Sequence, residues 1–465
     1  MRARIKKSES LINEPQSIAS HPDLVSDTKF QTESPLLRDR TQNLDNDSYI
    51  SSNIMMLLQV LGSLLLSLLA LYVVDANQSF RRVCYYTNWS QYREVPAKFL
   101  PENIDPQLCT HIIYAFATLE GNYLKPFEWN DDSTPWMVGM YAKVVAMKQK
   151  NPKLVVLLSV GGWNMGSALF TQMASTPENR KQFYTNATDF LRTRGFDGLD
   201  MDWEYPASRG SPPEDKEKFT SLMQLFLHRM IYKTSGKFCD RQWTVPLAQY
   251  FYTVCVCVCE CMVIYSKVFP LKFLFLIYSV VDFFNLMSYD YHGGSFDKVL
   301  GHNCPLYSLS DEEGLAKTFN MNWSANYWVL NGLPKEKLNI GIPVYGRGFK
   351  LTNKTCIAPG CPSSGPNAAG RYTRLEGFLS YYEICQMIKS GAKTYWIEEQ
   401  KVPYLVMDDQ WIGYDDAQSL TIKAQWLKEN AFGGFAVWDM ALDDFDNQCG
   451  NGTYYLINTL THALQ

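Results

Sequence analysis

The sequence predicts an α/β fold, a (β/α)8 TIM barrel with a small α+β insertion between strands 7 and 8. Short apolar runs alternate with helix-like segments, and several are apolar throughout, as parallel strands covered by helices are. The runs are Val83–Thr87, His111–Ala117, Leu154–Val160, Gly198–Trp203, Phe283–Tyr289, Leu338–Tyr345 and Gly434–Trp438. Their centres lie roughly 30 or more residues apart, which is the length of a βα unit.

Two of the steps between these runs are unusually long. The step between the fourth and fifth runs is about twice its neighbours, which predicts one further strand near residue 243 and brings the total to eight. The step before the last run is too long for a simple crossover. It predicts an insertion at about residues 348–415, a stretch rich in Tyr, Gly and Pro. The barrel and its insertion together are expected to occupy residues 80–465.

Two segments precede the barrel. Residues 1–53 are polar, mixed in charge and poor in aromatic residues, so we expect a disordered extension. Residues 54–76 include an uncharged apolar run, 54–74, of about the length that spans a bilayer. Either this run is a signal anchor in the membrane, or translation starts at a methionine inside it and the run is a cleaved signal peptide. Both alternatives predict an extracellular barrel, anchored or secreted.

The composition argues against several classes of function. The chain has 465 residues and a formal net charge of −4, with no basic block, which argues against nucleic-acid binding. The sequence contains no glycine-rich phosphate loop and no Cys/His spacing typical of metal sites, so neither a cofactor nor a metal is expected. Aromatic residues make up 14% of the chain, and their large flat faces suit flat ligands such as sugar rings.

The segment Asp197–Pro206 carries the most informative pattern. Acids alternate along a stretch that otherwise resembles a buried strand, and residues two apart in a strand point to the same face. Asp200, Asp202 and Glu204 therefore form a row on one side. Carboxylates held this close cannot all ionise, and such an unfavourable arrangement is more often functional than structural. The row predicts a catalytic site at the end of the fourth strand.

Other distinctive residues follow other strands. The active site of such a barrel lies at the C-terminal ends of its strands, so residues at these ends are expected to share one rim. They are Gly161, Gly162 and Trp163 after the third strand, Tyr289 and Asp290 after the sixth, Tyr345 and Arg347 after the seventh, and Trp438 at the end of the eighth. Aromatic and acidic side chains gathered at one rim favour a sugar-binding cleft.

The same residues stand in an order that is found in a known family. The motif DxxDxDxE is present as Asp197–Glu204, and the SxGG motif of the third strand as Ser159–Gly162. Segments similar to strands 1, 6, 7 and 8 of that family are Cys84–Trp89, Met287–Asp290, Gly341–Arg347 and Trp438. Over about residues 80–465 the chain resembles glycoside hydrolase family 18, the chitinases and chitinase-like lectins, in its animal and arthropod form.

The resemblance implies a role for each acid. Glu204 would protonate the glycosidic oxygen and then serve as the base that activates water, and a raised pKa would keep it protonated. The nucleophile would be the 2-acetamido oxygen of the substrate, because this family is a known exception to the two-carboxylate mechanism. Asp202 would orient the acetamido nitrogen and share a proton with Asp200, so the carboxylates would titrate as a set. Tyr289 would donate a hydrogen bond to the acetamido oxygen.

The resemblance also implies a set of substrate-binding residues around these four. Trp438 would form the floor of the subsite in which the sugar is distorted, and the others would line neighbouring subsites. The set is Tyr85, Trp89, Phe116, Gly161, Gly162, Trp163, Met287, Asp290, Tyr345, Arg347 and Trp438.

Cysteines and glycosylation triplets agree with the secretory route. Four of the 12 cysteines fall in one unusual stretch, and the remainder are compatible with disulfides. The resemblance implies the pairs Cys84–Cys109 and Cys385–Cys449, and Cys356 and Cys361 are close enough in the sequence to pair. Glycosylation candidates are Asn186, Asn322, Asn353 and Asn451, whereas the triplet at Asn88 lies in an expected strand, where glycosylation is not expected.

The resemblance fails between about residues 238 and 278. A fifth barrel strand is expected here, but Pro246 interrupts the candidate and would remove a ladder hydrogen bond. Val254–Cys261 alternates valine and cysteine, as the translation of a TG dinucleotide repeat does. We therefore interpret this segment as retained intron sequence or a faulty gene model, rather than as a metal site or a genuine insertion. The apolar run Val268–Val281 is too short for a membrane span.

A barrel without a proper fifth strand would have two unpaired edges. We therefore expect this product to fold poorly, and a correctly spliced version to be active. Sequencing the transcript across codons 235–282 tests the interpretation. A continuous mature message that encodes Val254–Cys261 would contradict it.

The leading functional hypothesis is a monomeric, endo-acting chitinase that cleaves β-1,4 N-acetylglucosamine linkages of chitin or chito-oligosaccharides with retention. The alternative is a chitin- or glycan-binding lectin without catalysis, which the same fold supports. The presence of Glu204 together with Asp202 and Tyr289 favours hydrolysis. A third hypothesis is endo-β-N-acetylglucosaminidase action on N-glycans, but the tryptophan-lined rim is better suited to a long linear polymer.

Overall fold

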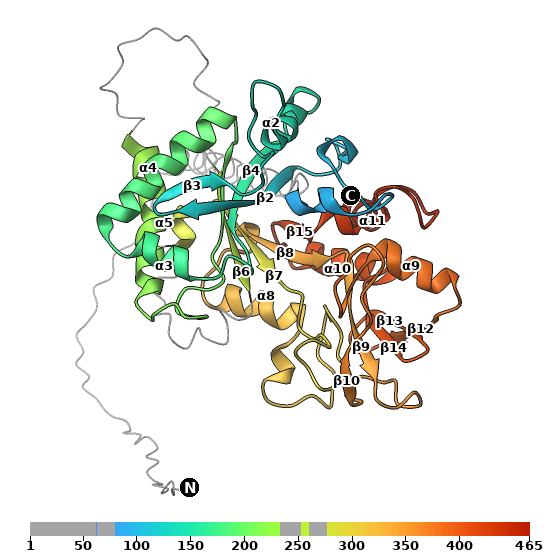
Figure 1. Ribbon diagram of the computed structural model, residues 1–465. Coiled ribbons are helices and arrows are strands. Elements are labelled where there is room, and N and C mark those ends of the chain that lie inside the picture. The colour runs from blue at the N-terminus through green and yellow to red at the C-terminus, as the bar shows by residue number, and fades with distance from the viewer. Residues whose placement is uncertain (1–61, 63–79, 233–252, 260–276) are drawn as a thin grey trace, which may run out of the picture. The chain divides into compact units, whose positions relative to one another are not determined.

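The computed structural model describes residues 80–232, 253–259 and 277–465, together with residue 62 (Figure 1). Within these residues, parallel strands follow one another around a ring in sequence order, and β1 pairs with both β15 and β2, which closes it. The barrel strands are β1 (Arg81–Thr87), β2 (His111–Glu120), β4 (Val155–Gly161), β5 (Gly198–Asp202), β6 (Thr253–Cys259), β7 (Phe283–Met287), β8 (Leu338–Pro343) and β15 (Gly434–Trp438). The predicted (β/α)8 barrel is confirmed.

Side chains alternate between two layers along the barrel strands, because successive residues of a strand face opposite sides. One set packs inside the ring: Val83, Tyr85, Ile113, Ala115, Leu157, Phe283 and Ala436. The residues between them, such as Cys84 and Ile112, pack in the larger apolar layer outside the ring. Strands covered on both faces are apolar throughout, which is why the sequence pattern identified them.

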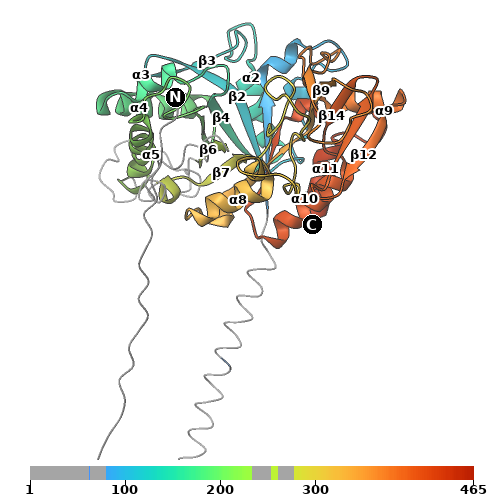
Figure 2. The same ribbon diagram turned by 90° about the horizontal axis from the view of Figure 1, so that it is seen from below.

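Helices cover the outside of the ring, as Figure 2 shows. They are α2 (Met140–Val145), α3 (Ala168–Ala174), α4 (Pro177–Arg194), α5 (Asp215–Tyr232), α8 (Met321–Leu330), α10 (Ala417–Glu429) and α11 (Tyr455–Leu464). The bounds of α4 follow from local chemistry: the Thr176 side chain accepts from Asn179 N, Pro177 opens the first turn, and Gly195 ends the helix at a φ of 79°.

The fifth barrel strand lies in the alternating Val-Cys run. β6 pairs in parallel with β5 on one side and with β7 on the other. The fifth strand, which the sequence pattern predicts near residue 243, is found at Thr253–Cys259, and the expectation of an incomplete barrel is wrong. Valine is β-branched and suits a pleated strand, and unlike the stretch around Pro246 this run contains no proline. Residue 243 lies outside the described residues, and the interpretation of the transcript stays a prediction.

The insertion between β8 and β15 forms a second, antiparallel sheet with one helix, α9 (Tyr381–Lys389), as predicted. Its strands are β9 (Tyr345–Leu351), β10 (Ser363–Pro366), β11 (Phe378–Ser380), β12 (Lys393–Ile397), β13 (Val402–Met407) and β14 (Gln410–Gly413). Phe349, Tyr404 and Trp411 lie in its core. β9 starts two residues after β8 ends, so Tyr345 and Arg347 belong to the insertion and not to the end of a barrel strand. A short strand, β3 (Tyr123–Pro126), pairs antiparallel with β2.

Three disulfides join the predicted partners, Cys84–Cys109, Cys356–Cys361 and Cys385–Cys449. Cys304 is a buried free thiol, and Cys239 lies outside the described residues. Asn88 begins a 3-10 turn after β1 instead of lying in the strand, and its buried amide donates to Asp131. The other four glycosylation candidates stay predictions.

The N-terminal segments cannot be assessed in the same way. The extension 1–53 and the apolar run 54–74, apart from residue 62, lie outside the described residues. Among the helices that the structure describes, none combines the length and the apolar character needed to cross a membrane.

Candidate active site

The row of acids lies at the end of β5, buried, as the alternation predicted. Asp200, Asp202 and Glu204 are 0%, 3% and 7% exposed. Asp200 Oδ2 accepts hydrogen bonds from Ser159 Oγ at 2.6 Å and from the Tyr85 hydroxyl at 3.2 Å. The apolar residues between the acids face the outer layer, where the Trp203 ring stacks on Phe170 at 5.1 Å.

Burial shifts the pKa values of two of these acids upward. The pKa of Glu204 is raised to about 7, mainly by burial and further by the charge of Asp290, against a hydrogen bond with Tyr205 and the positive charge of Arg209. The pKa of Asp202 is raised well above its usual value by burial and then by the charges of Glu204 and Asp200. Asp202 Oδ1 has no hydrogen-bond partner among the described residues. The site thus holds an acid whose pKa lies near neutrality and a buried carboxyl oxygen without a hydrogen bond.

Gly161 and Gly162 let β4 lie against the backbone of this row. Gly162 N donates to Asp202 O at 2.9 Å. A Cβ on Gly161 would lie 2.0 Å from Asp202 O, and one on Gly162 would lie 2.6 Å from the Phe116 ring. Their φ angles of 125° and 83° also favour glycine. Packing accounts for both glycines, and their predicted contact with substrate stays a prediction.

Replacing Gly161 with alanine is expected to destabilise the barrel by about 1–3 kcal/mol, through a strained φ and displacement of Asp202. Urea unfolding measures the change. Gly121→Ala is the matched control, because Gly121 also has a positive φ, 58°, but has nothing within 4 Å of its Cβ position. Equal free energies of unfolding for the two variants would contradict the packing role of Gly161.

Four predicted aromatic residues form one cluster, and one of them, Tyr85, bonds to Asp200 of the acid row. The ring of Trp438 lies 5.2 Å from that of Tyr85 and 6.0 Å from that of Phe116, and Trp89 stacks on Phe116 at 5.9 Å. Trp89 is 37% exposed, so part of this surface is open to solvent. Such a cluster offers aromatic faces to a flat ligand beside the acid row. Met287, half-buried at the end of β7, packs against the same interior cluster.

A second wall is built from the barrel and the insertion together. Asp290, after β7, accepts from Tyr345 OH at 2.6 Å and from Arg347 Nε at 2.8 Å, and both partners lie on β9. Burial alone would lower the pKa of Arg347, but the charge and hydrogen bonds of Asp290 raise it above its usual value. Burial raises the pKa of Tyr345 well above its usual value. Tyr289 is half-buried and packs edge-on against Tyr345 at 6.2 Å. The wall therefore joins four of the predicted residues.

A sequence match to a known family covers the acids and both aromatic walls. The sequence profile of the glycosyl hydrolases family 18 matches residues 81–443. The chain belongs to this family.

The relatives of this family-18 chain include enzymes and a binding protein. Chitotriosidase-1 of Mus musculus is 40% identical over 85% of this chain and 80% of its own length. Endochitinase of Brugia malayi is 39% identical over 84% of this chain and 74% of its own. A solved structure of human YKL-39, described as a pseudo-chitinase with retained chitooligosaccharide binding properties, has a TM-score of 0.74 at 35% identity, covering 83% of this chain and 100% of its own.

Beneath the acid row of this family-18 barrel runs a chain of buried hydrogen bonds that the sequence did not reveal. Arg81 Nε donates to Asn339 Oδ1, Asn339 Nδ2 to Asn285 Oδ1, and Asn285 Nδ2 to Tyr85 OH, each at 2.9 Å. Tyr85 in turn donates to Asp200. This series of hydrogen bonds orients the Tyr85 hydroxyl so that it donates to Asp200. The only signal for it in the sequence was an asparagine inside two otherwise apolar strands.

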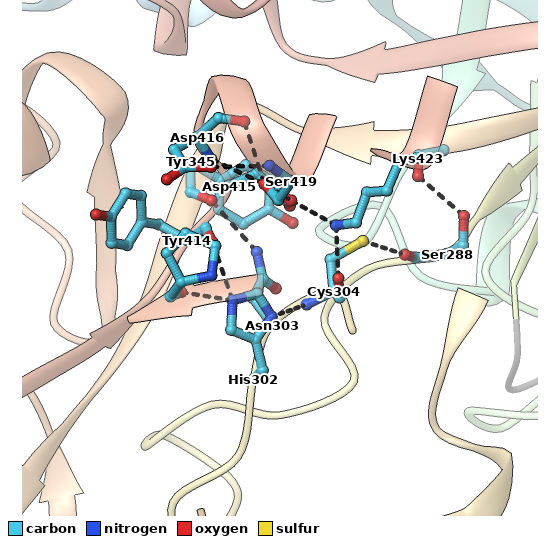
Figure 3. Close-up of polar contacts among 12 residues, drawn as sticks. Ser288, His302, Asn303, Cys304, Tyr345, Tyr414, Asp415, Asp416, Ser419 and Lys423 are labelled. Atoms are coloured by element: carbon cyan, nitrogen blue, oxygen red, sulfur yellow. Dashed lines mark hydrogen bonds and ion pairs between the residues drawn. The ribbon is translucent and has the colours of Figure 1, made fainter. Parts of the chain in front are cut away.

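The loop that carries Asp290 is held by three consecutive buried residues, His302, Asn303 and Cys304 (Figure 3). Asn303 Oδ1 accepts from Asp290 N at 3.0 Å, and Asn303 Nδ2 donates to Tyr345 O at 3.3 Å. Asn303 thereby binds both sides of the second wall. No sequence motif marked these residues, and several of their partners, such as Tyr345, lie in other elements.

His302 and Cys304 fasten the same loop to the insertion and to α10. Burial lowers the pKa of His302 to about 3, so the ring is neutral. His302 Nδ1 accepts from Cys304 N at 3.0 Å, which leaves the proton on Nε2 to donate to Tyr414 O at 2.9 Å. Lys423 Nζ on α10 donates to Cys304 O at 2.6 Å and pairs with the Asp415 carboxylate at 2.5 Å, with both ionic side chains buried (Figure 3).

The described residues contain no group of three His, Cys, Asp or Glu side chains able to hold a metal ion.

Trp163 lies on the loop after β4 and is 59% exposed, with the Arg209 guanidinium over its ring at 3.7 Å.

Proposed function

We propose that this family-18 protein is an endo-acting chitinase that hydrolyses β-1,4 N-acetylglucosamine linkages with retention. The observation that carries the proposal is the pair of acids at the end of β5. Glu204 has a pKa of about 7 and Asp202 a buried oxygen without a partner. A protonated acid supplies the proton that a glycosidic oxygen needs in order to leave, and the free oxygen suits an amide N–H of the substrate.

The reaction proceeds in two steps. In the first, Glu204 protonates the glycosidic oxygen while the substrate's acetamido oxygen attacks the anomeric carbon, which breaks the glycosidic bond and gives an oxazolinium ion. Asp202 accepts from the acetamido N–H, and Tyr289 donates to the acetamido oxygen. In the second step Glu204, now ionised, takes a proton from the water that attacks the anomeric carbon. The oxazolinium ring opens, and the substrate's acetamido group is restored. The net configuration is retained because both displacements invert the same carbon.

The aromatic cluster supports a sugar polymer as substrate. Trp89, Phe116 and Trp438 form a partly exposed aromatic cluster that packs on Tyr85. The relatives named chitotriosidase and endochitinase share the family. The disulfides of the barrel and insertion support an oxidising, extracellular location. Whether an N-terminal segment anchors or releases the protein is tested by probing secreted protein with an antibody to the N-terminus.

A non-catalytic, chitin-binding lectin is the second candidate, because YKL-39 shares the fold and is described as a pseudo-chitinase that binds chitooligosaccharides. One experiment distinguishes the two functions. The purified protein is incubated with colloidal chitin, and the anomers of the first soluble products are followed by NMR. We expect β-anomers to appear first and to mutarotate later. Binding to chitin without release of oligosaccharides would support the lectin and contradict the enzyme.

The pKa of Glu204 sets the pH dependence of the reaction. The acid acts in its protonated form, so kcat/KM is expected to be highest below pH 7 and to fall as the pH rises through about 7, the pKa of Glu204. Initial rates on a chito-oligosaccharide between pH 4 and 9 measure this limb. A rate that stays constant from about pH 6 to pH 9 would contradict the assignment of Glu204 as the acid.

A further inference from the structure

Arg209 joins two loops of the site that come from different strands. Its Nη1 donates to Glu204 O at 3.1 Å, and its Nη2 donates to Trp163 O at 2.9 Å. Its guanidinium also lies over the Trp163 ring, with Cζ 3.7 Å from the ring centroid. One side chain therefore touches the residue proposed as acid and the exposed tryptophan of the neighbouring loop.

The turn that carries Arg209 is built to hold it. Ala207, Arg209 and Gly210 have positive φ angles of 64°, 50° and 87°, a conformation that alanine and arginine adopt only when their surroundings fix it. Ala207 N donates to Ser211 Oγ at 2.9 Å, and Ser211 Oγ donates to Asp215 Oδ2 at 2.7 Å. Asp215 is fully buried, so these bonds tie the turn to the start of α5.

A second bond set joins the same two loops from the other end. Ser167, after β4, is buried and lies within 3.2 Å of Tyr205 O and of Ser208 O. Trp203 Nε1 donates to Ser167 Oγ at 3.2 Å. The loops after β4 and β5 are thus joined at Ser167 and at Arg209. The exposed Trp163 sits on the first of them.

Trp163 is 59% exposed although one face of its ring is covered. An exposed indole on a loop would normally lose rotational freedom when a sugar stacks on it, and that loss weakens binding. A guanidinium stacked on one face restricts the ring in advance and leaves the other face open. Cation–π contacts are strongest for Trp among the aromatic residues.

We propose that Arg209 is a positioning residue that holds Trp163 as a stacking platform for a sugar some units away from the cleaved bond, and ties that platform to the backbone of Glu204. This inference rests on the proposed function. The positive charge of Arg209 also lowers the pKa of Glu204, against the effect of burial. The same side chain therefore acts on chain-length preference and on the alkaline limb of the pH profile.

The test separates the stacking of Arg209 from its charge. Arg209→Lys keeps the charge and removes the planar stack, and Arg209→Gln removes both. Affinities for a chito-oligosaccharide of six sugars and for one of two sugars are measured by calorimetry in a Glu204→Gln background, where binding does not depend on turnover. Both substitutions are expected to weaken binding of the long ligand by roughly three- to ten-fold, and to leave binding of the short ligand unchanged.

The pH profile supplies the second readout in the catalytically intact protein. Arg209→Gln is expected to move the alkaline limb of kcat/KM upward by about half a pH unit, because removing a positive charge raises the pKa of Glu204. Arg209→Lys is expected to leave that limb in place. Arg371→Gln is the matched control, since Arg371 also lies over an aromatic ring, that of Tyr372 at 5.2 Å, but is in the insertion. It should change neither readout.

A double-mutant cycle tests whether Arg209 affects the affinity for the long ligand through Trp163. In a Trp163→Ala background, Arg209→Gln is expected to cause no further loss of affinity for the long ligand. Equal weakening of long and short ligands, or unchanged binding of the long one, would overturn the proposal. Absence of turnover in the wild-type protein would overturn the proposed enzyme instead, and the binding measurements would still decide the role of Arg209.

Discussion

Replacing Glu204 with glutamine is expected to lower kcat on chito-oligosaccharides by roughly 10²- to 10⁴-fold, the contribution of a positioned general acid. Glutamine keeps the size and most of the polarity of the side chain but has no proton to donate at any working pH. With its pKa raised to about 7 by burial, the native side chain keeps that proton at pH values below about 7. Release of reducing sugars and single-turnover rates measure the loss.

Affinity separates this loss of chemistry from a loss of binding. Calorimetry with the same oligosaccharide should give a dissociation constant within a few-fold of the wild-type value, because the aromatic cluster is untouched. Asp197→Asn is the matched control. Asp197 belongs to the same motif, but it accepts from Val156 N at 2.8 Å and pairs with Lys148, away from the acid row. Turnover by Glu204→Gln at the rate of the control would remove Glu204 from the mechanism.

Replacing Lys423 with methionine is expected to lower the free energy of unfolding by about 3–5 kcal/mol, the cost of breaking one partner of a buried ion pair. Lys423 and Asp415 are 0% and 1% exposed at the side chain. The substitution leaves the Asp415 carboxylate buried without its counter-ion, and Cys304 O loses its donor. Urea unfolding at pH 7 measures the change.

Two further variants show whether the loss comes from burial. Lys125→Met removes one partner of an exposed pair, Lys125–Glu120, and is expected to leave the unfolding midpoint unchanged. Replacing Lys423 and Asp415 together by apolar residues of similar size should restore much of the stability, because no unpaired charge remains. Equal effects of the buried and the exposed lysine substitutions would show that the cluster in Figure 3 contributes no more than a surface pair.

Much of this protein was predictable from the alternation of side chains along strands and from the order of the strands in the sequence. Asp200, Asp202 and Glu204 share a face because a strand has a period of two residues, and this holds wherever the strand lies. The rim residues were predictable for a related reason, since parallel strands end at one edge and bring Tyr289 and Trp438 to it. Disulfide partners followed from the family resemblance and were confirmed.

The remainder depended on tertiary contacts. A proline and a repetitive sequence argued against a strand at residues 238–278, but two neighbouring strands supply the hydrogen bonds that make Thr253–Cys259 a strand. Arg209 carried no motif, because its role needs Trp163 and Glu204 from two separate loops to be close. Asn303 was missed for the same reason: its role needs both Asp290, 13 residues before it, and Tyr345, 42 residues after it, to be close in space.

The anchoring of the Asp290 loop limits how this protein exchanges parts with its relatives. Consider a chimera in which only the insertion, β9 to β14, comes from a relative. The residues at positions 345 and 347 would then come from the relative, whereas their partner Asp290 and the anchoring Lys423 would come from this protein. Recombination breakpoints that preserve the wall lie before Phe283 and after Glu429, so that β7, the loop, the insertion and α10 are inherited as one block. Natural recombination between members of the family is expected to occur at the same boundaries.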